Sequence, residues 1–213
     1  MPAARDDPPR SSYRSPLRAR QAAQTRQTVL AAASRLFTQR GWAATTIAAV
    51  AAEAGTAVET VYAGFGSKSG LLTAAIDVAL VGDDQPVPLA ERPQYAQLGV
   101  GDRWERLGSA AHLVALIHER SVPLLRALQE AAASDPAAAA RWQRYEADRR
   151  TEIARGLGLV LGRRPSDRLV DAIWAIAGPE VFAKLVLDRG WSLQSYQRWL
   201  VDTVTALTES RRR

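Results

Sequence analysis

Hydroxyl and lysine side chains flank a glycine turn in the first third of the chain. Thr46 precedes the turn, Thr60 and Tyr62 follow it, and Lys68 comes directly after a Gly-Ser step. Hydroxyl and ammonium groups donate hydrogen bonds to phosphate oxygens, and such contacts fix the position of a protein on a nucleic-acid backbone. These residues therefore indicate a site that binds several successive phosphate groups. Such binding requires no catalytic step.

Two helices are predicted before this glycine turn. A first helix of about residues 20–39 ends near Gly41, because glycine takes a positive φ without a Cβ clash. Thr45 or Thr46 can cap the second helix. Each helix has apolar residues at spacings that share one face: Val29, Ala33, Leu36 and Phe37 in the first, and Ile47, Val50, Ala51 and Ala54 in the second.

A third helix follows the sharp turn for which Gly55 is suited. Thr56 and Glu59 have the spacing of a capping box, and an N-terminus of this kind leaves backbone N–H groups for a phosphate. Val61 and Phe65 are predicted to pack inward. Ser67 can cap a fourth helix that carries Lys68 in its first turn. The outward residues of the third helix are then Val58, Glu59, Tyr62 and Ala63.

This order of residues resembles the N-terminal domain of the TetR (tetracycline-repressor) family of transcriptional regulators, over about residues 20–77. The resemblance is carried by Leu36-Phe37, Gly41, Thr45-Thr46-Ile47, Ala51, Ala54-Gly55, Thr60-Val61-Tyr62, Phe65-Gly66-Ser67-Lys68 and Leu71-Leu72. It implies phosphate contacts by Thr46, Thr60, Tyr62 and Lys68. It implies that Ala48, Val58, Glu59, Ala63 and Gly64 face base edges, with Thr56 at the start of the reading helix.

Two departures from the family pattern affect this surface. Ala57 stands where the family often has a capping serine, so Thr56 is expected to act as the cap. Ala63 and Gly64 stand where larger polar, basic or aromatic residues are common. Glu59 could accept from a cytosine amino group, but no arginine faces a guanine. Specificity is therefore expected to depend on DNA shape and on an arginine-rich N-terminal arm.

Charge is unevenly distributed along the 213 residues, whose formal net charge is +6. Residues 1–82 hold nine Lys and Arg against five Asp and Glu, so this part carries +4. Residues 1–19 form a Pro/Ser/Arg-rich tail that is predicted to be disordered. Its basic residues suit either a solvated leader or a minor-groove arm: Arg5, Arg10, Arg14 and Arg18.

The remaining sequence predicts further helices and no strand, so the fold class is all-α. A helix-turn-helix domain of residues 20–82, with its motif at 46–65, is followed by an irregular linker of residues 83–102. Residues 103–213 are predicted to be helical, and the resemblance implies that they form an effector-binding and dimerisation domain. Asp135 or Ser134 can cap a helix that begins at Pro136. Pro123 and Pro179 lie inside helical patterns that they can kink or divide.

The last two helices, of about residues 166–188 and 192–208, are the candidates for a dimer interface. Intrachain packing explains their apolar stripes equally well, and the resemblance favours a four-helix bundle between two copies. The interface residues predicted are Phe182, Leu185, Tyr196, Trp199, Leu200, Val204 and Leu207.

The resemblance also implies an effector pocket among the middle helices, above the fourth. Its candidate lining residues are Trp104, His112, Leu116, Trp142, Tyr145 and Trp174, and each is alternatively an ordinary core residue.

An enzyme is disfavoured by the residues that are present. The chain has no cysteine, and His112 and His118 lie six positions apart, about 120° around a helix. No metal site or cofactor is expected, and no apolar run suits a membrane or a signal peptide, so the expected location is the cytoplasm. The function predicted is a homodimeric regulator, a repressor released from a palindromic DNA operator by a small molecule of unknown identity. The alternative is a helical hydrophobe- or protein-binding module with a non-functional helix-turn-helix.

Overall fold

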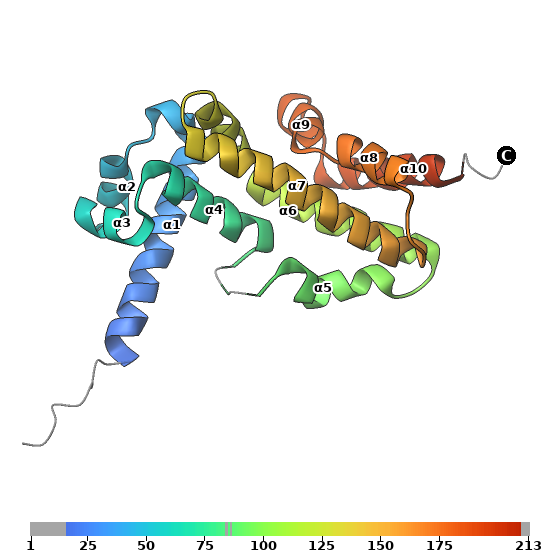
Figure 1. Cartoon of the computed structure of the whole chain (residues 1–213), viewed down its shortest axis with the longest axis horizontal. Helices are drawn as coiled ribbons and strands as arrows, with labels where there is room; N and C mark the ends of the chain where they lie inside the picture. Colours follow the sequence, from blue (N-terminus) through green and yellow to red (C-terminus); the bar gives the residue numbers. More distant parts are fainter. Residues whose placement is uncertain (1–15, 84, 86, 210–213) are drawn as a thin grey trace, which may run out of the picture.

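The computed structural model describes residues 16–83, 85 and 87–209, and every regular element in these residues is a helix (Figure 1). The predicted all-α class is confirmed. Four helices form one end of the molecule: α1 (Pro16–Ala44), α2 (Ile47–Glu53), α3 (Val58–Phe65) and α4 (Lys68–Val81). Because α1 begins at Pro16, Arg18 lies in a helix and not in the predicted tail. Arg5, Arg10 and Arg14 lie outside the described residues.

Gly41 breaks α1 where the sequence predicts the helix to end. Its φ is +72°, which glycine adopts without strain. The buried Thr45 stabilises the corner that follows, since its Oγ1 donates to the carbonyl oxygens of Leu36 and Gly41 at 3.1 and 2.8 Å. Thr46 then caps α2 by accepting from the Ala49 N–H at 3.1 Å. Of the two threonines proposed as the cap, Thr46 is the one used.

Two long helices, α6 (Arg103–Ala132) and α7 (Pro136–Leu161), run side by side from the four N-terminal helices to the opposite end of the molecule (Figure 1). Asp135 caps α7 by accepting from the Ala137 and Ala138 N–H groups, and Pro136 is the first residue of the helix as predicted. Pro123 does not divide α6, because the apolar side chains around it are buried and hold the helix in place: Val122, Leu124 and Leu125.

The predicted linker of residues 83–102 contains short helical turns: η1 (Leu89–Glu91), α5 (Pro93–Ala96) and η2 (Gln97–Gly99). Arg92 anchors it, with Nη1 and Nη2 donating to the two Asp83 carboxylate oxygens at 2.6 and 2.9 Å. This pairing lowers the pKa of Asp83 to about 2. Tyr95 and Leu98 are buried. The segment is thus part of the packed structure, and less irregular than the sequence suggests.

The C-terminal helices are α8 (Asp167–Ile176), α9 (Pro179–Phe182), the π-helical η3 (Ala183–Asp188) and α10 (Leu193–Glu209). Pro179 divides the predicted helix of residues 166–188, since α8 ends before it and α9 begins at it. Ser192 caps α10, as its Oγ accepts from the Ser195 N–H at 3.1 Å. These elements lie along one side of the α6–α7 pair (Figure 1).

Buried apolar residues gather in three clusters. The first joins α1–α4 to the C-terminal half of α6, so that Leu36, Val61 and Leu128 share one core and are each at most 1% exposed. The second lies between α6, α8 and α10, and the third between α5, α6 and α7. A displacement of α6 would therefore be transmitted directly to the four N-terminal helices, because close-packed interiors transmit strain.

No single helix in the described part of the chain is both long and apolar enough to cross a membrane. Only α3 and α4 taken together, across a 67° bend, reach that length and composition. The apolar residues of this pair, including Leu71, Leu72 and Ile76, are buried in the first core cluster.

Candidate nucleic-acid interface and ligand cavity

The turn between α2 and α3 is closed by backbone hydrogen bonds. Gly55, with φ +64°, donates to the Ala52 carbonyl at 3.2 Å, and Thr56 donates to the Ala51 carbonyl at 3.0 Å. This pair of bonds is a Schellman motif, which needs a left-handed residue at the first of the two donors, here Gly55. The turn fixes the angle at which α3 leaves α2.

The predicted capping role of Thr56 is wrong. The N-cap of α3 is Ala57, which makes no side-chain capping hydrogen bond, and the helix starts at Val58. The Thr56 N–H takes part in the turn that ends α2. Thr56 therefore lies one residue before the N-cap position of α3. The N-terminus of α3 therefore carries no side-chain cap.

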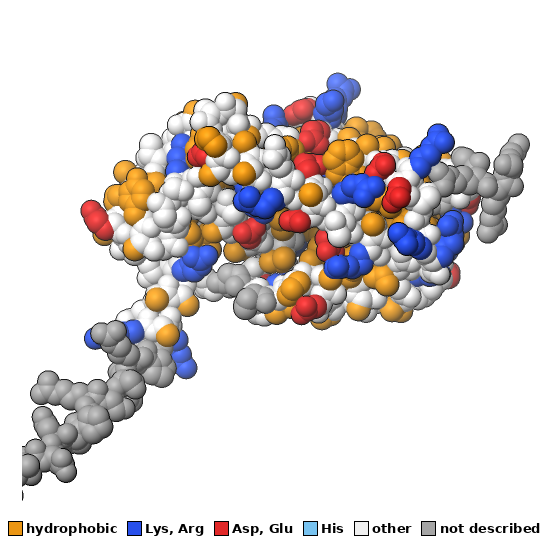
Figure 2. Space-filling view, viewed as in Figure 1, with side chains coloured by type: hydrophobic (Ala, Val, Ile, Leu, Met, Phe, Trp, Pro, Cys, Tyr) orange, Lys and Arg blue, Asp and Glu red, His pale blue; other side chains and the backbone are white. Residues whose placement is uncertain are grey.

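The outward face of α3 is uncovered at the far end of the molecule (Figures 1 and 2). Tyr62 is the most prominent residue, with 51% of its surface exposed. Figure 2 shows that this end is largely apolar with few charged side chains. The exposed residues at this end include seven of the predicted contacts: Thr46, Ala48, Glu59, Thr60, Tyr62, Ala63 and Gly64.

Val58 departs from its predicted outward position. It is half-buried and packs against the first core cluster, since it lies three residues from the fully buried Val61 on the inward side of α3. Thr56 is also half-buried. The exposed face that a duplex could meet is thus centred on Tyr62 and begins at Glu59.

Lys68 is engaged with its own chain. Its Nζ donates to the Trp42 carbonyl and lies 4.1 Å from the centre of the Trp42 ring. Burial lowers the pKa of Lys68, and the nearby Glu130 carboxylate partly opposes that shift. Glu130, from α6, also accepts from the Trp42 and Ala43 N–H groups at 2.9 and 3.1 Å. A predicted phosphate ligand is therefore held at a junction with the C-terminal helices.

Arg26 of α1 adds a positive charge beside α3 that the sequence motif does not reveal. Its guanidinium lies 4.7 Å from the centre of the Phe65 ring, and Nη1 approaches the Gly64 carbonyl at 3.5 Å. The side chain is exposed. Arg26 stands beside the end of α3 where Ala63 and Gly64 provide no polar side chain.

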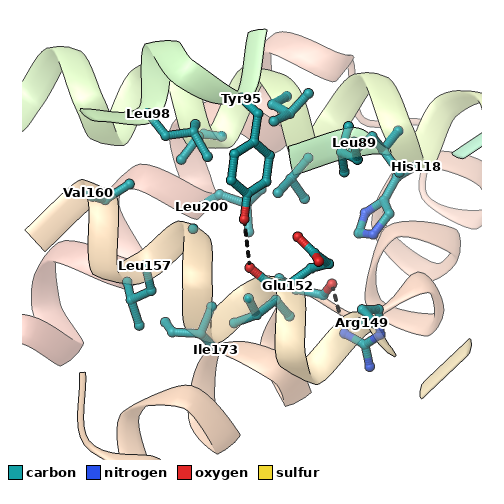
Figure 3. A pocket seen from close by; sticks show the side chains of 18 of the residues that line it. Leu89, Tyr95, Leu98, His118, Arg149, Glu152, Leu157, Val160, Ile173 and Leu200 are labelled. Atoms are coloured by element: carbon teal, nitrogen blue, oxygen red, sulfur yellow. Dashed lines mark hydrogen bonds between the residues drawn. The ribbon is translucent and has the colours of Figure 1, made fainter. Parts of the chain in front are cut away.

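A partly open cavity of about 470 Å³ lies between α4, the α5 segment, α6, α7 and α10 (Figure 3). Such a volume suits a drug-sized molecule. Leu80 and Val81, at the end of α4, form part of its wall, together with Leu98 and Leu107. Most of the wall is aliphatic, so an apolar ligand body would be favoured here.

Polar groups interrupt this apolar wall at a few places (Figure 3). The Tyr95 hydroxyl donates to the Glu152 carbonyl at 3.3 Å, and burial raises the pKa of Tyr95. Nδ1 of His118 lies 3.2 Å from the Tyr196 hydroxyl, and burial lowers the pKa of His118 to about 3. His118 is therefore neutral at pH 7. Tyr145 lines the same cavity and makes no hydrogen bond with its side chain among the described residues.

The four N-terminal helices also match a known family. Residues 29–75, which span most of α1 to α4, match the family described as bacterial regulatory proteins, tetR family. Residues 29–75 are therefore a TetR-type N-terminal segment. The chain matches no curated protein sequence.

Solved structures share the fold of most of the chain. A protein from Rhodococcus sp., described as a TetR-family transcriptional regulator, is 19% identical with a TM-score of 0.67, over 87% of this chain and 98% of that one. A TetR-family member from Streptomyces coelicolor A3 is 22% identical with a TM-score of 0.57, over 86% and 97%. The multidrug binding protein EbrR is 18% identical with a TM-score of 0.53, over 85% and 93%. These likenesses extend beyond α1–α4 to the helices around the cavity.

The cavity is lined by only one of the six predicted pocket residues, Tyr145. Trp142 and Trp174 line a separate cleft between α7 and α8. Trp104 is 58% exposed at the start of α6. His112 and Leu116 point away from the cavity, because they lie about 170° and 150° around α6 from the mean direction of its cavity-facing residues. The predicted pocket list is corrected accordingly.

Three of the predicted dimer residues belong to the core of the chain itself. Tyr196, Phe182 and Leu200 are at most 3% exposed, and the Phe182 and Tyr196 rings pack edge to face at 5.1 Å. Val204 lines the cavity. Half-exposed positions remain at Leu185, Trp199 and Leu207.

Proposed function

We propose that this chain is a sequence-specific DNA-binding transcriptional regulator of the cytoplasm, a homodimeric repressor released from a palindromic operator by a small molecule. The observation that carries the proposal is the uncovered outward face of α3, with Tyr62 51% exposed at the end of the molecule. A short exposed helix held by a tight turn from α2 fits the major groove. Thr46, Thr60, Tyr62 and Lys68 are the proposed phosphate contacts, and the first three are exposed.

Base reading is proposed for the exposed Ala48, Glu59, Ala63 and Gly64, with Val58 and Thr56 at the edge of the contact. This set offers few hydrogen bonds to bases, so DNA shape should supply much of the specificity. Arg26 is added as a phosphate contact, because its exposed guanidinium stands beside Gly64. Backbone contacts of this kind provide affinity and register without sequence information.

Two copies are proposed to associate through α8, η3 and α10. Leu187 and Trp191 are 45% and 36% exposed there, and the half-exposed Leu185, Trp199 and Leu207 belong to the same elements. Exposed apolar side chains gathered on one surface favour association. A two-fold dimer would present two α3 helices to successive turns of DNA, roughly 34–36 Å apart or somewhat more.

Release is proposed to act through α4. Its last residues, Leu80 and Val81, line the cavity, whereas its first residue, Lys68, lies near the DNA-facing end. α4 is tied to the long helices by Arg120 Nε, which donates to the Ala79 carbonyl at 3.0 Å, and by an Arg141–Asp77 ion pair at 2.6 Å. A ligand that displaces Leu80 and Val81 would thus move α4. A coupling of about 1–3 kcal/mol between cavity and DNA site suffices.

The test is to identify which fragments of its own genome the purified protein retains, and then to titrate one of them at several salt concentrations. A regulator should retain a palindromic sequence and lose affinity steeply as salt rises. It should also bind its operator at least a thousandfold more tightly than random DNA. Equal affinity for both would refute the proposal.

A second candidate function is a hydrophobe-binding module whose helix-turn-helix no longer reads DNA. The apolar outward face of α3 and the self-engaged Lys68 favour it, and the cavity suits it equally. Such a protein would bind ligands in the cavity, and its binding to DNA would be weak and the same for every sequence.

A further inference from the structure

The charged residues that line the cavity differ in how far their charge is already compensated. Four of them face it: Arg141, Asp148, Arg149 and Glu152. They all belong to α7, and Asp148 and Glu152 lie one helical turn apart on the same face. Their formal charges sum to zero. The charge that a ligand would meet therefore depends on which of these four groups are already paired with other groups of the protein.

Both arginines are engaged within the protein. Arg141 pairs with Asp77 of α4 at 2.6 Å, and only 11% of its side chain is exposed. Arg149 Nη1 donates to the carbonyl oxygens of Trp174 and Ala177, at 2.7 and 3.3 Å, while its Nη2 donates to Glu146 at 2.7 Å. The Arg149 guanidinium also lies over the Trp174 ring, beyond the cavity wall. The charges of both arginines are thus compensated within the protein, although Arg149 Nε is buried without a hydrogen-bond partner in the described structure.

The two carboxylates are less satisfied. Asp148 is exposed and forms no ion pair or hydrogen bond with its side chain among the described residues. Glu152 uses Oε1 to accept from Arg155 at 2.9 Å, whereas its Oε2 is buried without a hydrogen-bond partner in the described structure. A buried acceptor without a partner costs about 1–3 kcal/mol, and a donor on a bound molecule would remove that cost.

No other group around the cavity provides a positive charge. His118 is neutral because it is fully buried, and the Tyr95 and Tyr145 phenols stay protonated because burial raises the pKa of each. The rest of the wall consists mainly of aliphatic residues from α4, α6 and α10 (Figure 3). The cavity thus combines an apolar body with the unpaired Asp148 carboxylate and the unpartnered Glu152 Oε2 on one face of α7.

We infer that the effector of this chain is a lipophilic amine that is protonated at neutral pH, with its ammonium group against Asp148 and Glu152. Its apolar part fills the space bounded by Leu80, Val81 and Leu107. An ammonium group supplies the missing donor to Glu152 Oε2 and compensates the charge of Asp148, which offsets its own desolvation. The inference rests on the proposed function, since it names the chemical class of the releasing molecule.

Three probes with the same phenylbutyl body test the inference: 4-phenylbutylamine, 4-phenylbutan-1-ol and 4-phenylbutyrate. Their dissociation constants are measured by calorimetry with the full chain at pH 7 and without DNA. We expect the amine to bind at least tenfold more tightly than the alcohol, and the carboxylate to bind most weakly. Equal affinities, preference for the carboxylate, or no binding of any probe at millimolar concentration would overturn the inference.

Substitutions test which carboxylates cause the preference for the amine. Glu152→Gln keeps the shape of the side chain and removes its charge, so the amine should lose about fivefold or more in affinity while the alcohol is unaffected. Asp148→Asn should act in the same direction. Glu119→Gln is the matched control, because Glu119 is an exposed carboxylate outside the cavity. An amine preference that persists in both cavity variants would overturn the placement of the ammonium group.

Release of operator DNA is scored separately from probe binding. Loss of the amine preference in a protein that still binds its operator refutes the effector class alone. An amine preference in a protein that binds no operator refutes the regulator and leaves a cation-binding module.

Discussion

At the scale of single residues, the exposed hydroxyl of Tyr62 is the most direct test of the DNA-facing surface. We expect Tyr62→Phe to raise the Kd for every DNA sequence by a similar factor, because a phosphate contact carries no base information. Loss of one hydrogen bond of about 1 kcal/mol corresponds to roughly a fivefold increase. Fluorescence anisotropy with the operator, its single-base variants and random DNA measures this. Weakening confined to one base position would place Tyr62 against a base edge.

A second residue-scale prediction concerns His118 and pH. The unfolded chain binds a proton at His118 below about pH 6.5, whereas the folded chain does so only below about pH 3. Stability therefore falls as the pH drops through this interval, since the unfolded state binds more protons. We expect His118 to account for about 2 kcal/mol of the stability lost between pH 7 and pH 5.

His118→Gln removes this titration and should flatten the dependence of the free energy of unfolding on pH by that amount. Urea titrations at several pH values measure it. His112→Gln is the matched control, since His112 is exposed, and it should follow the wild-type slope. If both variants behave like the wild type, His118 is protonated in the folded protein and its burial has been misjudged.

At the scale of elements, Glu130 connects α6 to the corner after α1. Its carboxylate accepts from the Trp42 and Ala43 N–H groups and lies close enough to Lys68 to affect its pKa. Glu130→Gln retains one acceptor and removes the charge. We expect a small loss of thermal stability, and a severalfold gain in affinity for random DNA at low salt that fades as salt rises.

The matched control for that prediction is Glu119→Gln, an exposed carboxylate on the same helix. Its net charge change is identical, so it isolates the effect of position beside Lys68. Equal gains in DNA affinity for the two variants would mean that Glu130 acts only through the net charge of the protein.

Elements differ in how well the sequence predicts them, because some signals are local and others are not. Gly41, Asp135 and Pro179 act on their own backbone neighbours, and the breaks predicted there are present. Thr56 fails as a cap because α3 begins at Val58, which puts Ala57 at the N-cap, and the Schellman turn that ends α2 sets this start. Such competition between adjacent motifs is not visible in a spacing rule.

At the scale of the whole molecule, the rotation of each helix about its axis decides which of its residues face the core. The sequence does not give this rotation. Phe182 and Tyr196 have the apolar spacing of an interface, yet they pack against each other inside the chain. His118, missed as a cavity residue, is distinguished from His112 only by the face of α6 that meets α7. Periodicity identifies an apolar face but does not say whether it meets the same chain or another copy.

The dimer is the prediction that belongs to the whole molecule, and Leu187 of η3 tests it with little disturbance of the core because 45% of its surface is exposed. We expect Leu187→Asp to yield monomers in sedimentation equilibrium, since a carboxylate buried between two copies would lack a partner. Operator affinity should fall at least a hundredfold, because two half-sites are no longer bound by one linked pair of reading helices. Leu159→Asp, at a 38% exposed leucine of α7, is the matched control and should remain dimeric. A Leu187→Asp protein that stays dimeric with wild-type operator affinity would move the interface away from η3.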